Sequence, residues 1–159
     1  MITVIMASPR KNGFSSGLLT DFLNKTNEPY KIYNAYELSA APCIGCGYCK
    51  ENGNCVNRDL DELFDSILAS QRLVIATPIY NFTVPSPLKA IFDRAQVFYE
   101  HPVQGNRKLH LLVSCGRSGE VSIPFTEKIV KTVFDNLGFS EYSTEIQNYT
   151  DDTEAKLCP

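Results

Sequence analysis

The chain begins Met1-Ile-Thr-Val-Ile-Met-Ala-Ser-Pro-Arg-Lys-Asn-Gly-Phe-Ser-Ser-Gly17. Residues 1–7 are an apolar run of the kind found in buried strands, and residues 8–13 are polar and contain a proline and a glycine. An amphipathic, helix-like pattern begins at Phe14. A strand followed by a hydroxyl-rich loop and a helix start predicts an anion site, because the free N–H groups of a helix start attract negative charge. We therefore expect a phosphate group to bind just after the first strand.

The rest of the chain alternates between strand-like and helix-like segments. Apolar or alternating runs predict strands at residues 30–36, 73–76, 108–115 and 139–147. Helical spacing of apolar residues predicts helices over residues 14–25, from Asp59, from Ser86 and up to Leu137. The expected helix caps are Ser15 or Ser16 for the first helix, Asp59 for the second and Ser86 for the third.

Five strands alternating with four helices predict an α/β fold with a parallel sheet covered by helices on both faces. The expected arrangement is a flavodoxin-like three-layer sandwich with strand order 2-1-3-4-5. Residues 1–147 form the expected domain, with a Cys-rich loop at 38–58, and residues 148–159 form a polar, acidic tail. Loops 8–17, 77–86 and 114–119 all follow strands, so we expect them to converge on one edge of the sheet.

Composition excludes several classes of protein. The chain has 159 residues, 43% of them hydrophobic, and a net charge of −3, which disfavours a nucleic acid as the main partner. No apolar run approaches the length of a membrane span, and the N-terminus does not resemble a signal peptide. We therefore expect a cytoplasmic protein, in which the six cysteines do not form structural disulfides.

The first loop favours FMN over a dinucleotide. It lacks G-x-G-x-x-G and has only Gly13 and Gly17, whereas a pyrophosphate needs closely spaced glycines. A single terminal phosphate suits the hydroxyls, the amide and the charge that the loop offers on Ser8, Arg10, Lys11, Asn12, Ser15 and Ser16. The alternative is that Ser15 and Ser16 only cap a helix.

Two further loops are expected to hold the flavin ring. Prolines restrict the second loop, which displays aromatic side chains and backbone polar groups at Pro78, Ile79, Tyr80, Asn81 and Phe82. In the third loop, Ser114 and Gly116 are expected beside the flavin, and Arg117 is either a further ligand or a solvated surface residue. The alternative for Tyr80 and Phe82 is that they are loop aromatics packed on the next helix.

Four cysteines follow one another in the pattern Cys43-x2-Cys46-x2-Cys49-x5-Cys55. This spacing lets one tight loop wrap thiolates around an iron–sulfur cluster, and the intervening glycines allow sharp turns. Zinc, a Cys46–Cys49 redox dithiol and a purely structural loop with packed free thiols remain alternatives. Because the loop follows the second strand, we expect it on the edge of the sheet where the flavin lies.

The motifs of these loops resemble those of the NAD(P)H-dependent FMN reductase family. The resemblance is carried by Ala7-Ser-Pro-Arg-Lys-Asn-Gly13 with Ser15-Ser16, and by Thr77-Pro-Ile-Tyr80 with Pro87-Leu-Lys-Ala-Ile-Phe-Asp-Arg94. The cysteine run is similar to that of the family's iron–sulfur flavoprotein branch. The resemblance extends to about residue 147 and implies a flavodoxin-like fold, bound FMN, and paired subunits with the flavin near their interface. The chain departs from many relatives at Asn81-Phe-Thr-Val84, and it ends soon after the fifth strand.

Three functions are compatible with these features. The first is an FMN-dependent oxidoreductase that passes electrons from NAD(P)H to a small acceptor, such as a quinone or a flavin. The alternative is an iron–sulfur flavoprotein that transfers electrons from a ferredoxin-like donor, with a [4Fe-4S] cluster on the cysteine loop. A third possibility is a metal-stabilised binding module without a redox role. No acid–base or nucleophile constellation is visible, so no catalytic side chain is assigned. A homodimer or homotetramer is expected, without nucleic-acid or membrane partners.

Overall fold

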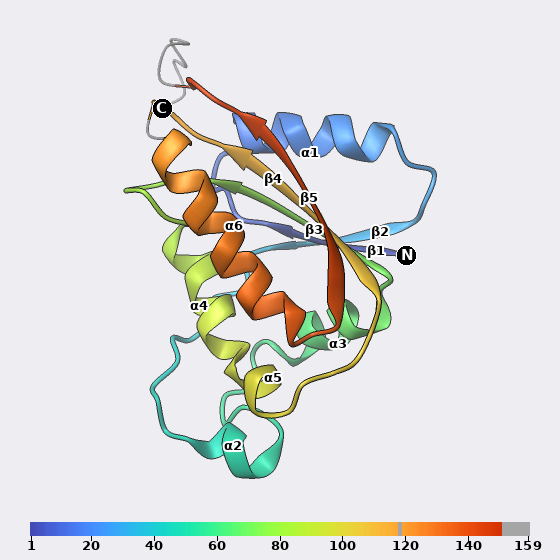
Figure 1. The fold of residues 1–159 in the computed structure, drawn as a ribbon, viewed down its shortest axis with the longest axis vertical. Coiled ribbons are helices and arrows are strands. Elements are labelled where there is room, and N and C mark those ends of the chain that lie inside the picture. Colours follow the sequence, from blue (N-terminus) through green and yellow to red (C-terminus); the bar gives the residue numbers. More distant parts are fainter. Residues whose placement is uncertain (118, 151–159) are drawn as a thin grey trace.

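A computed structural model of the chain describes residues 1–117 and 119–150. Five strands form one parallel sheet in the order β2-β1-β3-β4-β5, which confirms the expected topology (Figure 1). The elements in chain order are β1 (Ile2–Met6), α1 (Phe14–Asn24), β2 (Tyr30–Asn34), α2 (Tyr48–Asn52), α3 (Asp61–Ala69), β3 (Arg72–Pro78), α4 (Ser86–Arg94), α5 (Gln96–Glu100), β4 (Arg107–Ser114), α6 (Gly119–Asp135) and β5 (Phe139–Gln147).

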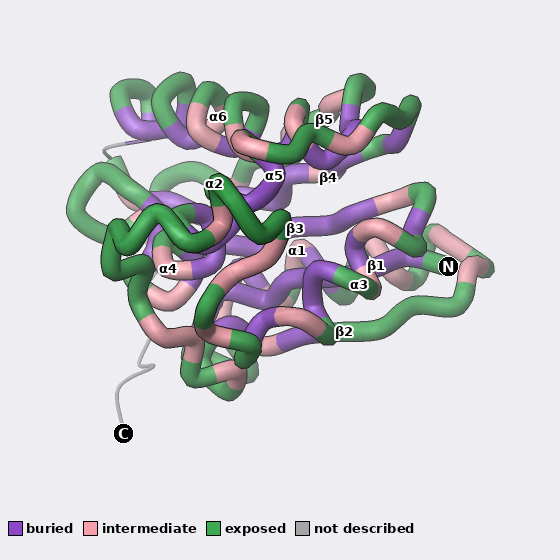
Figure 2. Tube along the Cα trace, turned by 90° about the horizontal axis from the view of Figure 1, so that it is seen from below, coloured by how far each residue is buried: buried purple, intermediate pink, exposed green. Residues whose placement is uncertain are grey.

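The sheet separates two hydrophobic cores of unequal size. Helices α3, α4, α5 and α6 contribute to the larger core, which includes Ile75 of β3 and Phe134 of α6. Among the described residues, helix α1 alone covers the smaller core on the opposite face, where Leu19 packs with Val4 and Val74. All residues of β1 are buried, as expected for a central strand covered on both sides (Figure 2).

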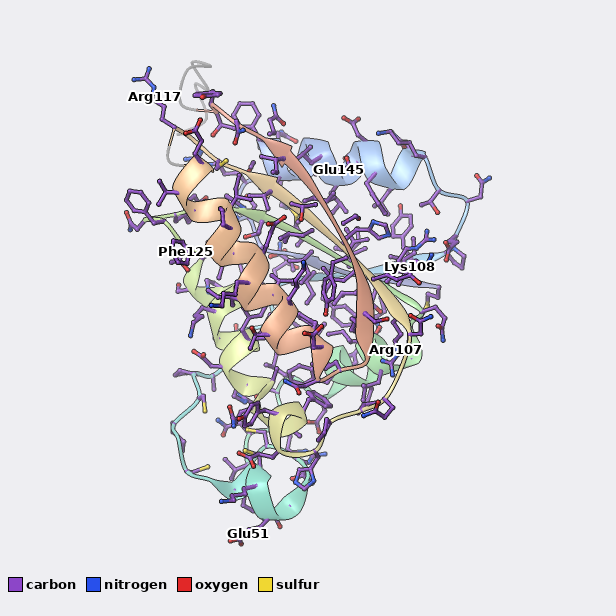
Figure 3. The ribbon with its side chains drawn as sticks, in the orientation of Figure 1. Glu51, Arg107, Lys108, Arg117, Phe125 and Glu145 are labelled. Carbon is purple, nitrogen blue, oxygen red and sulfur yellow. The ribbon has the colours of Figure 1, made fainter. Side chains whose placement is uncertain are left out.

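Helices cover both faces of the sheet as expected, but the α1 side of the edge strand β5 is left uncovered. Lys108 and His110 of β4 lie on the α1 side of the sheet, because the ring of His110 packs on Phe22 of α1. The β5 residues paired with that side of β4 are polar, and Glu145 points toward solvent beside α1 (Figure 3). On this side, β5 has no apolar side chains that a helix could bury. The α1 side of β5 is therefore exposed to water, as one side of an edge strand often is.

The helix starts differ from the expected caps. Gly13 is the N-cap of α1, so Ser15 and Ser16 lie inside its first turn instead of capping it. Helix α4 begins at Ser86 after Pro85, one residue earlier than expected. Asp59 does not cap α3, because its carboxylate binds Arg94 and the N–H of Ala41 instead.

Helix α2 was not predicted, because five residues are too few for a helical period to show. The apolar stripe expected from Ser86 through Phe98 is divided between α4 and the short helix α5, which meet at Ala95. No helix within the described residues is both long and apolar enough to cross a bilayer.

Candidate functional site

Three loops meet at the carboxyl edge of the sheet, as their positions after β1, β3 and β4 predict. The side-chain oxygens of Ser15 in α1 and Ser114 at the end of β4 are 2.7 Å apart, and both residues are buried. The N–H of Ile79 donates to the carbonyl of Ser114 at 2.9 Å. Ser114 therefore joins the first and second loops to the third.

The first loop presents an uncapped helix start. Within the described residues, no side chain caps α1 at Gly13, so the N–H groups of its first turn lack the usual partner. Ser16 donates its hydroxyl hydrogen to the carbonyl of Arg10 at 2.8 Å, and the N–H of Arg10 donates to the hydroxyl oxygen of Ser8 at 3.2 Å. These bonds fix the loop in a shape that leaves backbone N–H groups pointing out of the helix start.

The predicted phosphate ligands divide into two groups. Ser8 and Ser15 are buried, and Arg10 and Asn12 are exposed at the rim of the loop. Because the hydroxyl of Ser16 already donates to Arg10, the sequence overstated its availability as a donor to a ligand. The donor set fits a phosphate monoester through backbone N–H groups, the Ser8 hydroxyl and the charge of Arg10.

The second loop makes a tight two-residue turn. Tyr80 and Thr83 exchange backbone hydrogen bonds of 2.8 and 3.0 Å. The two residues between them, Asn81 and Phe82, have φ angles of 48° and 65°, in the left-handed region that costs a residue with a Cβ about 1–2 kcal/mol. The Phe82 side chain is 62% exposed, so the alternative that it packs on the next helix is wrong.

Tyr36 is a residue at this edge that the sequence analysis missed. It follows β2, and burial together with the neighbouring Tyr80 raises the pKa of its hydroxyl. The signal was available, since any residue just after β2 reaches the same edge of a parallel sheet. Tyr36 therefore lies at the same edge of the sheet as the second loop.

The third loop is partly buried. Ser114 and Cys115 are buried, Gly116 is half-buried and Arg117 is exposed. The thiol of Cys115 lies 2.9 Å from the side-chain oxygen of Asn148, so it packs at the strand end.

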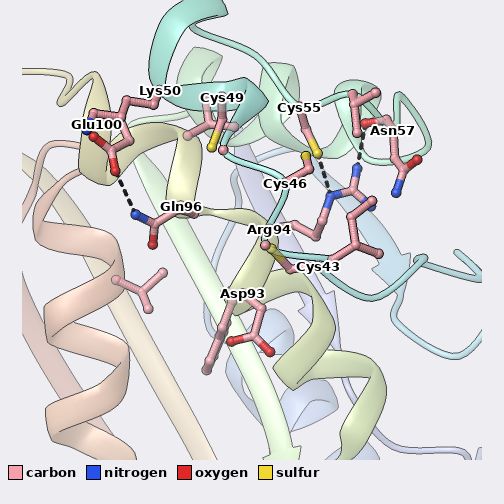
Figure 4. A pocket seen from close by; sticks show the side chains of 17 residues that line it. Cys43, Cys46, Cys49, Lys50, Cys55, Asn57, Asp93, Arg94, Gln96 and Glu100 are labelled. Atoms are coloured by element: carbon pink, nitrogen blue, oxygen red, sulfur yellow. Dashed lines mark hydrogen bonds between the residues drawn. The ribbon is translucent and has the colours of Figure 1, made fainter.

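The cysteine loop surrounds a cavity of about 630 Å³ (Figure 4). All four cysteines of the run line it, and the other walls come from α4, α5 and α6 through residues such as Phe92, Val97, Glu100 and Val133. Gly45 and Gly47 have φ angles of 64° and 74°, so the expected sharp turns do require glycine there.

The cavity is not at the flavin edge, and that expectation is wrong. The second loop precedes α4, whereas the cavity contacts Asp93 and Arg94 at its far end. Nine residues of helix separate the two places by about 13 Å. After β2 the chain leads down to α2, which lies beside α5 at the end of the molecule away from the second loop (Figure 1).

The thiols share a cavity but do not converge on a point. Cys43 and Cys46 are exposed, Cys49 and Cys55 are half-buried, and all are free. In the described part of the chain, no three Cys, His, Asp or Glu side chains are grouped closely enough to hold a metal ion. Desolvation raises the pKa of the Cys49 thiol. Thiolates are ligands of both iron–sulfur clusters and zinc ions, so the donor chemistry of the loop fits either group.

Arg94 holds the base of the cysteine loop and was given no role from the sequence. Its side chain is almost fully buried and donates hydrogen bonds to Ala41, Cys55, Asn57 and Asp59. The hydrogen bond from Arg94 also lowers the pKa of the Asp59 carboxyl. A buried arginine gives no sequence signal of its own, because a helical arginine is normally exposed.

Sequence and structure comparisons show which known proteins the chain resembles. The family model described as NADPH-dependent FMN reductase matches residues 1–140. An iron-sulfur flavoprotein from Methanosarcina thermophila is 28% identical over 138 residues, covering 84% of this chain and 71% of that protein. Another from Clostridioides difficile strain 630 is 29% identical over 138 residues, covering 82% of this chain and 61% of that protein. Further iron-sulfur flavoproteins match over about half of their length.

A solved structure titled NAD(P)H:quinone oxidoreductase from Methanothermobacter marburgensis has the same fold. Its TM-score is 0.71 at 18% identity, and the match covers 98% of this chain and 90% of that one. The topology, the uncapped helix start at the switch of strand order, and the match of the family model over most of the chain lead to one conclusion. The chain belongs to the NADPH-dependent FMN reductase family.

Proposed function

We propose that this chain is an FMN-dependent oxidoreductase that takes electrons from NAD(P)H and passes them to a small acceptor, such as a quinone or a flavin. The observation that carries the proposal is the meeting of three strand-end loops around an uncapped helix start, with Ser114 bonded to both neighbours. The family assignment supports the cofactor. When bound, FMN supplies the ring that accepts and releases the electrons, and the protein supplies position and electrostatics.

Different residues of the site would bind the phosphate and the ring of FMN. The helix start after Gly13, with Ser8 and Arg10, would hold the phosphate. The backbone groups of Ile79 to Phe82 and the phenol of Tyr80 would border the ring, and Ser114 and Gly116 would close its other side. No side chain in the described residues is proposed as an acid or base, so these residues bind and orient and leave proton transfer to solvent and ligand.

The cysteine cavity favours a second function, electron transfer through an iron–sulfur cluster. Four free thiols line one cavity, and relatives of the chain are named iron-sulfur flavoproteins. In this function a ferredoxin-like donor would replace NAD(P)H. The separation of about 13 Å along α4 means that the two centres would not share ligands within one subunit.

The remaining proposals concern the domain boundaries, the oligomeric state and the cellular location of the chain. Residues 1–147 would be one FMN-binding domain followed by a tail at 148–159, of which residues 151–159 lie outside the described part. A homodimer or homotetramer is supported by Val121 and Phe125, which are 58% and 63% exposed on one face of α6. A reducing cytoplasm would keep the described thiols free.

One series of measurements on the anaerobically prepared chain tests these functions. We expect FMN fluorescence to be quenched on binding, and NADPH or NADH to bleach the bound flavin. Without quenching, the proposed FMN site is wrong. If flavin binds and only a reduced ferredoxin-like donor bleaches it, the second function replaces the first. For the loop, iron with acid-labile sulfide supports the cluster, whereas zinc without sulfide contradicts it.

A further inference from the structure

Arg94 ends α4 at a position where its guanidinium reaches both ends of the cysteine loop. One Nη donates to the carbonyl of Ala41 at 2.9 Å, before the first cysteine. The other Nη donates to the carbonyl of Asn57 at 2.6 Å and to the Asp59 carboxylate at 2.7 Å, after the last cysteine. Arg94 is 2% exposed, so its guanidinium is shielded from competing water.

Asp59 also takes part in the contacts among Arg94, Ala41 and Asn57, which we call the Arg94 junction. Its second carboxylate oxygen accepts the N–H of Ala41 at 2.7 Å, while the first accepts Arg94. Ala41 is thus held through both its N–H and its carbonyl group. Residues 42 to 57 begin and end at one ion pair, between the buried Arg94 and the more exposed Asp59, which fixes the two ends of the loop relative to α4.

The fourth hydrogen bond of Arg94 is made by its Nε atom and is directed at the sulfur of Cys55. Its Nε lies 3.0 Å from the Sγ atom of Cys55 (Figure 4). A guanidinium stays protonated at all relevant pH values and presents its donors in a rigid plane, so this N–H is always available to the sulfur. A charge-assisted hydrogen bond is stronger when the acceptor carries negative charge, as a metal-bound thiolate does.

We infer that Arg94 is a positioning residue of the cysteine loop. It holds the loop closed at its base before any metal binds, and it directs one hydrogen bond onto the Cys55 sulfur when that sulfur is an iron ligand. The second part rests on the proposed iron–sulfur cluster, and the first part does not. Hydrogen bonds to the sulfurs of a cluster stabilise its reduced, more negative state and thus raise its reduction potential.

Two variants separate these parts, and a third is the control. Arg94→Lys keeps a positive charge but loses the planar set of donors, so both parts are affected. Asp59→Asn weakens the junction at Ala41 and leaves the Arg94 bond to Cys55 possible. Arg58→Lys changes a neighbouring arginine whose exposed ion pair with Asp61 holds no part of the junction.

The first measurement is amide hydrogen exchange of residues 42–57 in the metal-free full-length chain. We expect exchange to be faster by roughly tenfold or more in Arg94→Lys, because at least one charge-assisted bond is lost. It should be faster by a smaller factor in Asp59→Asn and unchanged in Arg58→Lys. Unchanged exchange in the five strands shows that the variants fold. Loop exchange equal to the wild type in both junction variants overturns the positioning role.

The second measurement is the reduction potential of the reconstituted cluster. It should shift to more negative values in Arg94→Lys and stay at the wild-type value in Asp59→Asn and Arg58→Lys. An unshifted potential in Arg94→Lys overturns the role of the hydrogen bond to sulfur. If the wild type takes up no iron and sulfide but Arg94→Lys still loosens the loop, the proposed cluster fails and the closure of the loop by Arg94 stands.

Discussion

The hydroxyl oxygens of Ser15 and Ser114 lie 2.7 Å apart, although the two residues are 99 positions apart in the chain. Both are buried, so each is the main partner that the other has in place of water. This contact connects the start of α1 to the end of β4. It is the point at which the loop proposed for the phosphate and the loop proposed for the ring are held in register.

We expect Ser114→Ala to lower the free energy of unfolding by about 1–3 kcal/mol, because the buried Ser15 hydroxyl loses its partner. FMN affinity should fall as well, since the two loops are no longer tied. Urea unfolding and FMN fluorescence titration measure these effects. Ser140→Ala, which removes an exposed hydroxyl, is the control and should change stability by less than about 0.5 kcal/mol. Equal effects of the two substitutions would show that the buried pair has no special role.

The uncapped start of α1 predicts a preference for a phosphorylated flavin. FMN should bind at least about a hundredfold more tightly than riboflavin, because two or more charge-assisted hydrogen bonds are added by the phosphate. Arg10→Gln should weaken FMN binding and leave riboflavin binding unchanged. Competition titrations with both flavins give the comparison. Equal affinities for the two flavins would place the phosphate elsewhere.

The sheet order and the convergence of the three loops were predictable because they follow from hydrophobic period and chain order. An apolar run such as Leu73 to Ala76 specifies a buried strand, and the right-handed crossover rule then leaves few topologies. The proposed ligand loops follow from the same reasoning, since parallel strands all end at one edge.

Side-chain partners were not predictable, because they depend on residues that are distant in the sequence. Asp59 fits a helix cap by local pattern, but a buried arginine 35 positions away binds it more strongly than a helix end does. The position of the cysteine cavity was missed for the same reason. The hydrogen bonds of Arg94 hold the ends of the loop at the C-terminal end of α4, away from the proposed flavin edge. No local sequence motif predicts these bonds.

The turn at Asn81 and Phe82 predicts a conflict between stability and ligand binding. Phe82→Gly should raise the free energy of unfolding by about 1 kcal/mol, because glycine adopts a left-handed φ angle without cost and the exposed ring contributes little burial. Phe82→Ala removes the ring but keeps the strained angle, so it should not stabilise. If the ring contacts bound flavin or acceptor, both variants should weaken that binding equally. A destabilised glycine variant would mean that the ring packs on the protein after all.

The exposed position of Cys46 predicts that its thiol is not needed for folding. Cys46→Ser should abolish any iron–sulfur absorbance after reconstitution and change the free energy of unfolding by less than about 0.5 kcal/mol. Cys115→Ser alters a buried thiol outside the loop and should keep the absorbance. Visible spectra and iron analysis of the two variants decide the matter. Unaltered absorbance in Cys46→Ser would remove this residue from the proposed ligand set.

His110 predicts how stability depends on pH. Burial, with the positive charge of Arg72, lowers the pKa of its ring, and its Nε2 atom is buried without a hydrogen-bond partner in the described residues. The folded state thus binds a proton less readily than the unfolded state, whose histidine titrates near 6.5. Stability is therefore complete above that value and declines as the pH falls through it toward the folded pKa.

We expect the midpoint of urea unfolding to fall between pH 7 and pH 5, and part of that fall to disappear in His110→Gln. The Ser143 hydroxyl, 2.6 Å from Nδ1 of the ring, can also bond a glutamine amide, so the variant should fold. His101, which is exposed at the end of α5, is the matched control, and His101→Gln should keep the wild-type slope. An identical slope in wild type and His110→Gln would show that other groups set the acid limit of this fold.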